Sequence, residues 1–175
     1  MRLDIQKTTA PLGADGVTPP IKLRGMRGMI AAKMLQSLQQ SAQLTHHASA
    51  RLDALQALRQ RRRDDELPVP SLQDLLLRLI VQTLGDFPAL NATLEENCIT
   101  RHAVVHLGLA IPLPDDLLVA PALFDAQTLR LGELPEARRE LTEQARSGKL
   151  GVKALTGATF TVSNLGRSRV HHFTP

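Results

Sequence analysis

The chain has 175 residues, of which 43% are hydrophobic and 22% are charged, a composition typical of one soluble globular domain. It contains four Phe but no Trp and no Tyr, so the core must be built mainly from Leu, Ala, Val and Ile. The formal net charge is +4, but basic and acidic residues are mostly interleaved, and a surface that stacks nucleic-acid bases would need aromatic residues that this chain lacks.

Cysteine usage and hydropathy limit the compartment. The single cysteine, Cys98, excludes an internal disulfide bond and a zinc-type cysteine cluster. Residues 1–10 lack the apolar stretch of a signal peptide, and no segment approaches the length of a transmembrane helix. We therefore expect a cytoplasmic protein that does not enter a membrane.

The first third of the chain predicts an arm, a helix, a strand and a second helix. Residues 1–20 are rich in Pro and Gly with little periodicity, which indicates a flexible linker or arm. In residues 26–40 apolar side chains recur every three or four positions, as on one face of a helix. Residues 44–52 alternate apolar and polar positions, which predicts a half-buried strand. Asp53 is placed to cap a helix that runs to about Arg62.

The middle of the chain predicts a buried helix and a central strand. Ser71 followed by Asp74 has the capping-box pattern of a helix start. The helix that follows is apolar enough to be largely buried, and Pro88 ends it. Residues 104–113 are nearly continuous in apolar side chains, which is typical of a central strand covered on both faces.

The last third predicts a hairpin, a helix and a final strand. Residues 114–116 indicate a turn, and residues 117–120 a returning strand. A charged, exposed helix is expected around residues 131–145 and closed by Gly148. Residues 158–163 predict a strand that turns at residues 164–166. Because helices and strands alternate without a repeat, we expect an α/β domain whose sheet is covered by helices.

The one dense basic run invites a nucleic-acid hypothesis. It consists of four arginines and is followed directly by Asp64, Asp65 and Glu66: Arg59, Arg61, Arg62 and Arg63. Because acidic residues follow at once, we favour a solvated helix end over a nucleic-acid-binding module.

No phosphate-binding glycine loop, metal-spaced cluster or nucleophile elbow is present in the sequence. The histidine pairs are His46 with His47 and His171 with His172. Neighbours on a strand point to opposite faces, so neither pair chelates one metal ion simply, and we predict no metal site.

The most informative segment is residues 159–166, in which a β-rich run ends in Ser163 and a tight turn follows. A hydroxyl at such a place can donate a rigidly aimed hydrogen bond to charge that develops on a substrate oxygen. The same residues are also typical of an ordinary strand-ending turn.

Several segments, in order, resemble the lipoate-dependent acyltransferase cores of the 2-oxoacid dehydrogenase complexes, which share a fold with chloramphenicol acetyltransferase. Residues 160–166 are similar to the signature Phe-Thr-(Ile or Val)-Ser-Asn-Leu-Gly of that family. The other similar segments are residues 25–34, 87–92, 108–110, 117–121, 148–150 and 172–175. The resemblance implies a mixed α/β sheet covered by helices, with residues 21–175 forming the larger, N-terminal part of the catalytic domain and the C-terminal part lacking.

The resemblance also implies a function. Members of the family move an acyl group from a dihydrolipoyl arm to coenzyme A, so coenzyme A would be a substrate and another domain or chain would supply the lipoyl group. Ser163 would stabilise the tetrahedral oxyanion, and Asn164, Gly166 and Arg27 would contribute to substrate binding. The expected partners are a homotrimer or a cage of trimers, a lipoyl domain and the other 2-oxoacid dehydrogenase components, with no nucleic acid.

One departure limits the catalytic prediction. The general base of the family lies in a later motif, His-x-x-x-Asp-Gly, which this sequence does not contain. Neither His171 nor His172 is followed by Asp-Gly at that spacing, so we assign no base. The alternative hypothesis is therefore a non-catalytic oligomeric scaffold of the same fold.

Overall fold

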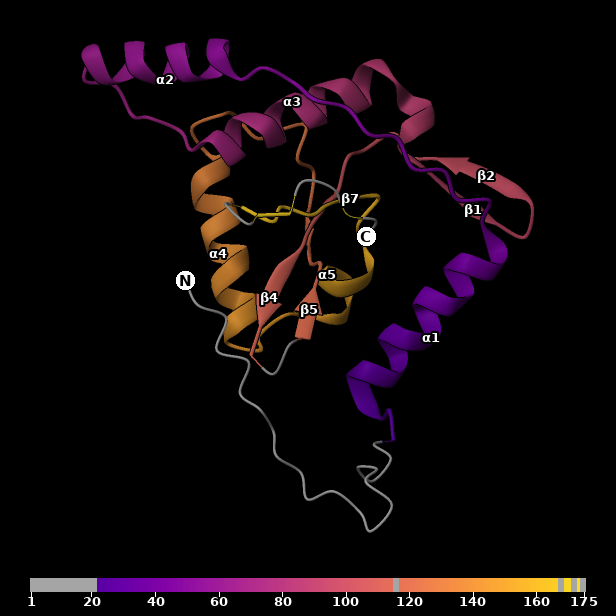
Figure 1. Ribbon diagram of the computed structural model, residues 1–175. Coiled ribbons are helices and arrows are strands. Elements are labelled where there is room, and N and C mark those ends of the chain that lie inside the picture. The colour runs from indigo at the N-terminus through magenta and orange to yellow at the C-terminus, as the bar shows by residue number, and fades with distance from the viewer. Residues whose placement is uncertain (1–21, 115–116, 167–168, 171–172, 174–175) are drawn as a thin grey trace. The chain divides into compact units, whose positions relative to one another are not determined.

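A computed structural model describes residues 22–114, 117–166, 169, 170 and 173. The chain divides into two compact units, Met1–Gln43 and Leu44–Pro175 (Figure 1). The predicted arm at residues 1–20 lies outside the described residues, and so do His171 and His172.

The first unit contains one described helix, α1 (Gly25–Gln40), which confirms the predicted helix. It begins at Gly25, whose φ of +58° suits a residue without a side chain. Its apolar side chains are largely exposed, as the 68% exposure of Met29 and the 63% exposure of Leu38 illustrate. The apolar spacing therefore identified the helix but not a buried face.

The strand predicted at residues 44–52 is wrong. These residues form no strand and precede the next helix, and Leu44 is 79% exposed. Alternating polarity shows only that, if the chain were extended, one face would be apolar and the other polar. A strand also needs a ladder of hydrogen bonds to a neighbour, and no described strand pairs with this segment.

Helix α2 (Asp53–Asp64) occurs where a second helix was expected, but Asp53 is not its cap. Leu52 holds the cap position, and the Asp53 carboxylate instead accepts a hydrogen bond from Arg51 Nε at 2.7 Å. Asp53 is thus the first residue of the helix, one position later than a capping side chain would need to be. None of the residues of α2 is buried.

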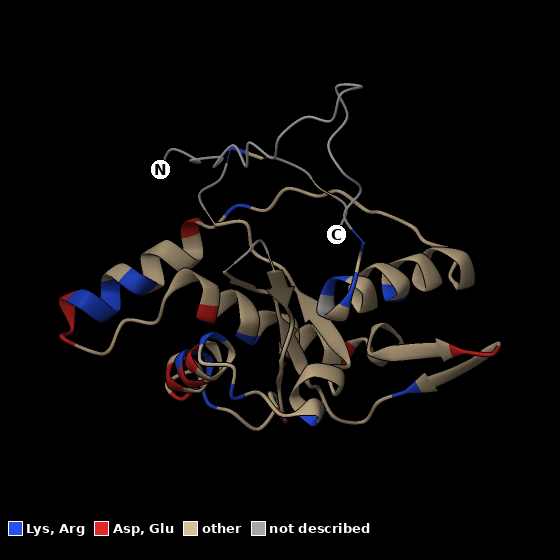
Figure 2. Ribbon diagram, turned by 90° about the horizontal axis from the view of Figure 1, so that it is seen from below, with Lys and Arg blue, Asp and Glu red and all other residues tan. Residues whose placement is uncertain are grey.

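Two arginines of the basic run hold the connection between α2 and the next helix. Arg59 Nε donates to the carbonyl oxygen of Pro70 at 3.0 Å, and Arg62 Nε donates to that of Pro68 at 2.7 Å. In Figure 2 acidic residues directly follow the basic ones at the end of α2, as the sequence requires. These contacts support the interpretation of the run as a helix end.

Helix α3 (Leu72–Asp86) begins with the predicted capping box. Ser71 Oγ accepts from the Asp74 N–H at 3.1 Å, and the Asp74 carboxylate accepts from the Ser71 N–H at 3.2 Å. One face of α3 is buried, but Leu79 on the other is 45% exposed, so the prediction of a largely buried helix holds for one face only. A 3₁₀ turn, η1 (Pro88–Leu90), follows the helix.

A hairpin that the sequence interpretation missed comes next. Strands β1 (Ala92–Glu95) and β2 (Cys98–Arg101) pair antiparallel. Asn91, only 1% exposed, fastens its base: Nδ2 donates to the carbonyl oxygens of His102 at 3.1 Å and Val104 at 2.8 Å.

The single strand predicted at residues 104–113 is divided into β3 (Leu107–Leu109) and β4 (Ile111–Leu113), which belong to different sheets. At the break, the Ala110 N–H donates to the Val162 carbonyl oxygen at 3.0 Å, which keeps this residue with the partner of β3. All three residues of β3 are buried, so the expected central strand exists but is short. Strand β4 pairs antiparallel with β5 (Leu117–Val119), the predicted returning strand; residues 115–116 of the predicted turn lie outside the described part.

The sheet that carries the C-terminal segment has the order β6–β3–β7. Strand β6 (Ala122–Leu123) pairs antiparallel with β3, whereas β7 (Phe160–Val162), which is shorter than the predicted strand, pairs with β3 in parallel. Along the chain, α4 (Leu134–Arg146) and the short α5 (Val152–Thr156) lie between β6 and β7. Gly148, with φ of +68°, follows α4 as predicted.

The core lies where α3 and α4, both labelled in Figure 1, pack against β3 and β6. It is aliphatic, as the composition required, and its central members are Leu77, Val81, Leu84, Leu107, Leu109, Leu123, Leu134 and Leu141. Helix α4 is therefore exposed on its outer side only. None of the described helices is both long and apolar enough to cross a membrane.

Candidate functional site

Ser163 follows the last residue of β7 and is exposed. The parallel register pairs Leu107 with Phe160 and Leu109 with Val162, and the hydrogen bond from the Ala110 N–H to Val162 closes this ladder. Ser163 therefore lies directly past the hydrogen-bonded end of a strand that packs against the core.

The predicted turn after Ser163 is confirmed. Asn164 Oδ1 accepts a hydrogen bond from the Gly166 N–H at 2.8 Å, an Asx-type turn. Gly166 has φ of +62°, in the left-handed region where a side chain is disfavoured. The Asn164 side-chain oxygen thus serves to close the turn.

Gly108 on β3 lets β7 approach closely. A Cβ at this position would lie 2.9 Å from Thr161 Oγ1 and 3.0 Å from the Ala158 Cβ. Real Cβ atoms essentially never come this near, so any larger residue would displace β7. Gly108 therefore belongs to the support of the turn that carries Ser163.

The predicted site residues fall in both units. Ser163, Asn164 and Gly166 share one turn in the second unit, whereas Arg27 lies in the first turn of α1 in the first unit. The roles of all four residues in catalysis or substrate binding stay predictions.

The contacts of His102 and His106 in the second unit are structural. His106 Nδ1 accepts from the Asp125 N–H at 3.0 Å, so this nitrogen carries no proton in that bond. His102 Nε2 lies 3.2 Å from Thr93 Oγ1. We assign neither histidine the role of general base toward a thiol.

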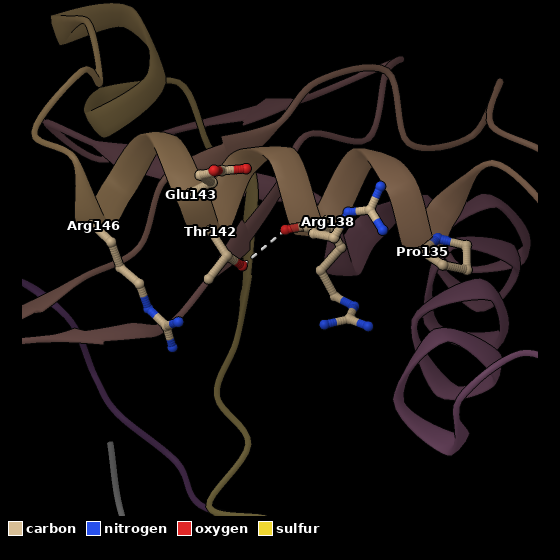
Figure 3. A pocket seen from close by; sticks show the side chains of 6 residues that line it. Pro135, Arg138, Thr142, Glu143 and Arg146 are labelled. Atoms are coloured by element: carbon tan, nitrogen blue, oxygen red, sulfur yellow. Dashed lines mark hydrogen bonds between the residues drawn. The ribbon is translucent and has the colours of Figure 1, made fainter.

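A separate hollow of about 650 Å³ lies along α4 (Figure 3). All of its lining residues belong to that helix: Pro135, Arg138, Arg139, Thr142, Glu143 and Arg146. Arg138 is paired with Asp74 and Arg139 with Glu136, and the Thr142 hydroxyl donates to the Arg138 carbonyl oxygen, as the dashed line in Figure 3 marks. Two of its arginines are already paired and no residue of the Ser163 turn lies in its wall, so the hollow is not the better candidate for catalysis.

The turn after β7 thus presents an exposed Ser163 directly past a strand that packs against the core. Residues 17–175 match the sequence model of the family described as 2-oxoacid dehydrogenases acyltransferase (catalytic domain). The chain belongs to this family.

Curated relatives carry the names of several acyltransferase components. The dihydrolipoyllysine-residue acetyltransferase component of the acetoin cleaving system of Bacillus subtilis is 34% identical over 98% of this chain and 46% of its own length. The dihydrolipoyllysine-residue succinyltransferase component of the 2-oxoglutarate dehydrogenase complex of Cupriavidus necator is 31% identical. The match covers 93% of this chain and 41% of that protein's own length. The chain thus spans less than half the length of these relatives.

Solved structures show the same fold. The dihydrolipoamide acetyltransferase of Azotobacter vinelandii superposes with a TM-score of 0.79 at 28% identity, over 91% of this chain and 68% of that one. A truncated catalytic core of the 2-oxoacid dehydrogenase multienzyme complex from Thermoplasma acidophilum has a TM-score of 0.74 over 85% of this chain and 69% of that one; at 22% identity it supports the fold alone. The predicted α/β fold of an acyltransferase core is confirmed.

Proposed function

We propose that this chain forms part of the catalytic core of a dihydrolipoyl acyltransferase. In this function an acyl group passes from the thiol of a dihydrolipoyl arm, supplied by another domain or chain, to the thiol of coenzyme A. Membership of the family supports the proposal, and the placement of Ser163 at the end of β7 carries it. Residues 21–175 would be the catalytic part and residues 1–20 a linker.

The reaction gives Ser163 a defined task. The sulfur of coenzyme A attacks the carbonyl carbon of the acyl thioester, and the carbonyl oxygen becomes an oxyanion in the tetrahedral intermediate. The Ser163 hydroxyl donates a hydrogen bond to that oxygen until the carbon–sulfur bond to the dihydrolipoyl group breaks. A donor that is already aimed needs no reorganisation as the charge develops, and this is why its removal lowers the rate strongly.

The attacking thiol must also lose its proton. A thiol with a pKa of about 8.5 is mostly protonated at neutral pH, so a general base accelerates the attack. This sequence has no His-x-x-x-Asp-Gly motif, and the base would therefore come from outside these residues. A serine, a histidine and an asparagine are the residues whose catalytic roles were investigated in the Azotobacter vinelandii acetyltransferase, which fits a division of labour between a donor and a base.

An oligomeric assembly is part of the proposal. A solved structure described as the cubic core of the pyruvate dehydrogenase multienzyme complex superposes on this chain with a TM-score of 0.79 at 28% identity. A homotrimer or a cage of trimers, visited by lipoyl domains and the other dehydrogenase components, is therefore the expected working state.

The proposal is tested by Ser163→Ala in the natural full-length protein, assayed with an acyl-dihydrolipoamide and coenzyme A. Loss of this donor should lower kcat about 100- to 1000-fold. Ser147→Ala is a matched control, because the Ser147 hydroxyl is exposed and bonds only carbonyl oxygens at the end of α4. Equal turnover in the wild type and Ser163→Ala would refute the assigned role.

A second candidate function is a non-catalytic scaffold of the same fold, favoured by the missing base motif. In this case the full-length protein would assemble normally but show no acyl transfer with any acyl-dihydrolipoamide. Measured turnover that depends on Ser163 would exclude the scaffold.

A further inference from the structure

Thr159, the residue before β7, forms hydrogen bonds with His106, the residue before β3. The Thr159 N–H and the Phe160 N–H donate to the carbonyl oxygen of His106, at 2.8 and 3.3 Å. The Thr159 hydroxyl oxygen accepts from the His106 N–H at 3.0 Å and lies 3.4 Å from the His106 carbonyl oxygen, to which it donates. Both polar groups of the His106 peptide are thus satisfied by one residue that is 53 positions away.

The anchor at His106 is itself held in place. Its Nδ1 accepts from the Asp125 N–H at 3.0 Å, and its ring packs edge-on against Phe124 with centroids 4.9 Å apart. One residue earlier, the Val105 N–H donates to Gln127 Oε1 at 2.9 Å. Thr159 therefore binds to the residue directly before β3, which has contacts on several sides.

Strand β7 needs such a fastening because it is short. It has three residues, and β3 is its one neighbour among the described strands. A slip of one residue would move the strand by about 3.3 Å and turn each side chain to the other face, so that Phe160 and Val162 would leave the core against which they pack. The hydroxyl of Thr159 adds bonds that only the observed register allows.

This register decides where Ser163 lies. From Thr159 the chain runs through the pairs Leu107 with Phe160 and Leu109 with Val162, and Ser163 is the next residue. Because Ser163 directly follows this ladder, a change of the β7 register at Thr159 also changes the position of the Ser163 hydroxyl. The Thr159 side chain, which does not itself contact substrate in this scheme, thus affects the position of the Ser163 side chain, which does.

We propose that the Thr159 hydroxyl is a positioning group for Ser163, acting by locking the register of β7 on β3 at His106. This inference rests on the proposed function, since it presumes that Ser163 stabilises the oxyanion. It assigns to Thr159 an effect on the chemical step rather than on substrate binding.

The test compares three substitutions in the natural full-length protein. Thr159→Val keeps the shape and removes the hydroxyl, Thr159→Ser keeps the hydroxyl, and Thr159→Ala removes both the hydroxyl and the methyl group. A misplacement of about 1 Å can cost up to about 100-fold in rate, so we expect Thr159→Val to lower kcat by about 10- to 100-fold with little change in KM. Thr159→Ser should restore most of the lost kcat. If Thr159→Val fails to fold, the difference between Thr159→Ser and Thr159→Ala carries the comparison.

A double-mutant cycle separates this inference from the proposed function. In the Ser163→Ala background Thr159→Val should cause no further loss of kcat, because there is no hydroxyl left to misplace. If Ser163→Ala lowers kcat but Thr159→Val does not, or if Thr159→Val causes the same loss in both backgrounds, the positioning role is wrong. If Ser163→Ala itself has no effect, the proposed function fails first, and the inference fails with it.

Discussion

The ion pair between α3 and α4 allows a sharp stability prediction. The Asp74 carboxylate is only 1% exposed and accepts a hydrogen bond from Arg138 Nε at 2.7 Å and from the Ser71 N–H at 3.2 Å. In Arg138→Met the carboxylate would remain buried without its cation. Breaking a buried pair in this way costs about 3–5 kcal/mol, and we expect about 3 kcal/mol. The lower end applies because the Arg138 side chain is 27% exposed, so water reaches part of the site.

The neighbouring residue supplies a matched control. Arg139 pairs with Glu136 on the same helix, but these side chains are 72% and 66% exposed. Such a surface pair contributes about 0–1 kcal/mol, so Arg139→Met should be nearly neutral. The free energy of unfolding is measured by urea titration followed by far-ultraviolet circular dichroism, since the chain has no Trp or Tyr for fluorescence. Equal losses in the two variants would refute the reasoning.

The same pair predicts a pH dependence. Burial acts to raise the pKa of Asp74, but hydrogen bonds from Arg138 and Ser71 and the charge of Arg138 outweigh it, so the pKa lies below its ordinary value of 3.8. Because the folded pKa is the lower one, the stabilisation is complete above the unfolded pKa of about 3.9 and is lost as the pH falls through the folded pKa. The stability difference between the wild type and Asp74→Asn should therefore shrink as the solution is acidified below about pH 4. A difference that stays constant or grows on acidification would contradict this account.

Three further predictions concern the supports of the fold. Gly108→Ala should destabilise by about 1–3 kcal/mol through overpacking against β7, whereas Gly132→Ala, where a Cβ meets nothing within 4 Å, should not; similar urea midpoints would argue against the close approach. Asn91→Ala should cost about 1–3 kcal/mol, because it removes two hydrogen bonds to the carbonyl oxygens of His102 and Val104, and should speed hydrogen exchange in β1 and β2. Gly166→Ala should cost about 1–2 kcal/mol because of its left-handed backbone, and the idea fails if its thermal stability and kcat equal those of the wild type.

The sequence identified the elements whose signals are local. The apolar spacing of α1, the capping box of Ser71 and Asp74, the glycine after α4 and the Asx-type turn at Asn164 each depend on residues a few positions apart. The β1–β2 hairpin also had a local signal that was missed. Its connection, Glu96 and Asn97, takes positive φ at both residues, the pattern of a two-residue hairpin turn in which Asn is favoured.

Partners distant in the chain could not be predicted in this way. Residues 44–52 have the alternation of a strand but no described strand beside them, and the apolar run at residues 104–113 is shared between two sheets. Alternation and hydrophobicity report which side chains avoid water, but a strand begins and ends where another chain segment supplies hydrogen bonds.

The family and the Ser163 turn were therefore legible in the sequence, because short motifs and local backbone preferences carry them. The contacts that hold β7 and the two core helices in place, by contrast, join residues far apart in the chain. The bond between Thr159 and His106 spans 53 positions, and the pair of Arg138 with Asp74 spans 64. The sequence around each of these residues does not indicate its partner. A hydrogen bond across such a separation forms only after the core has brought the two segments together.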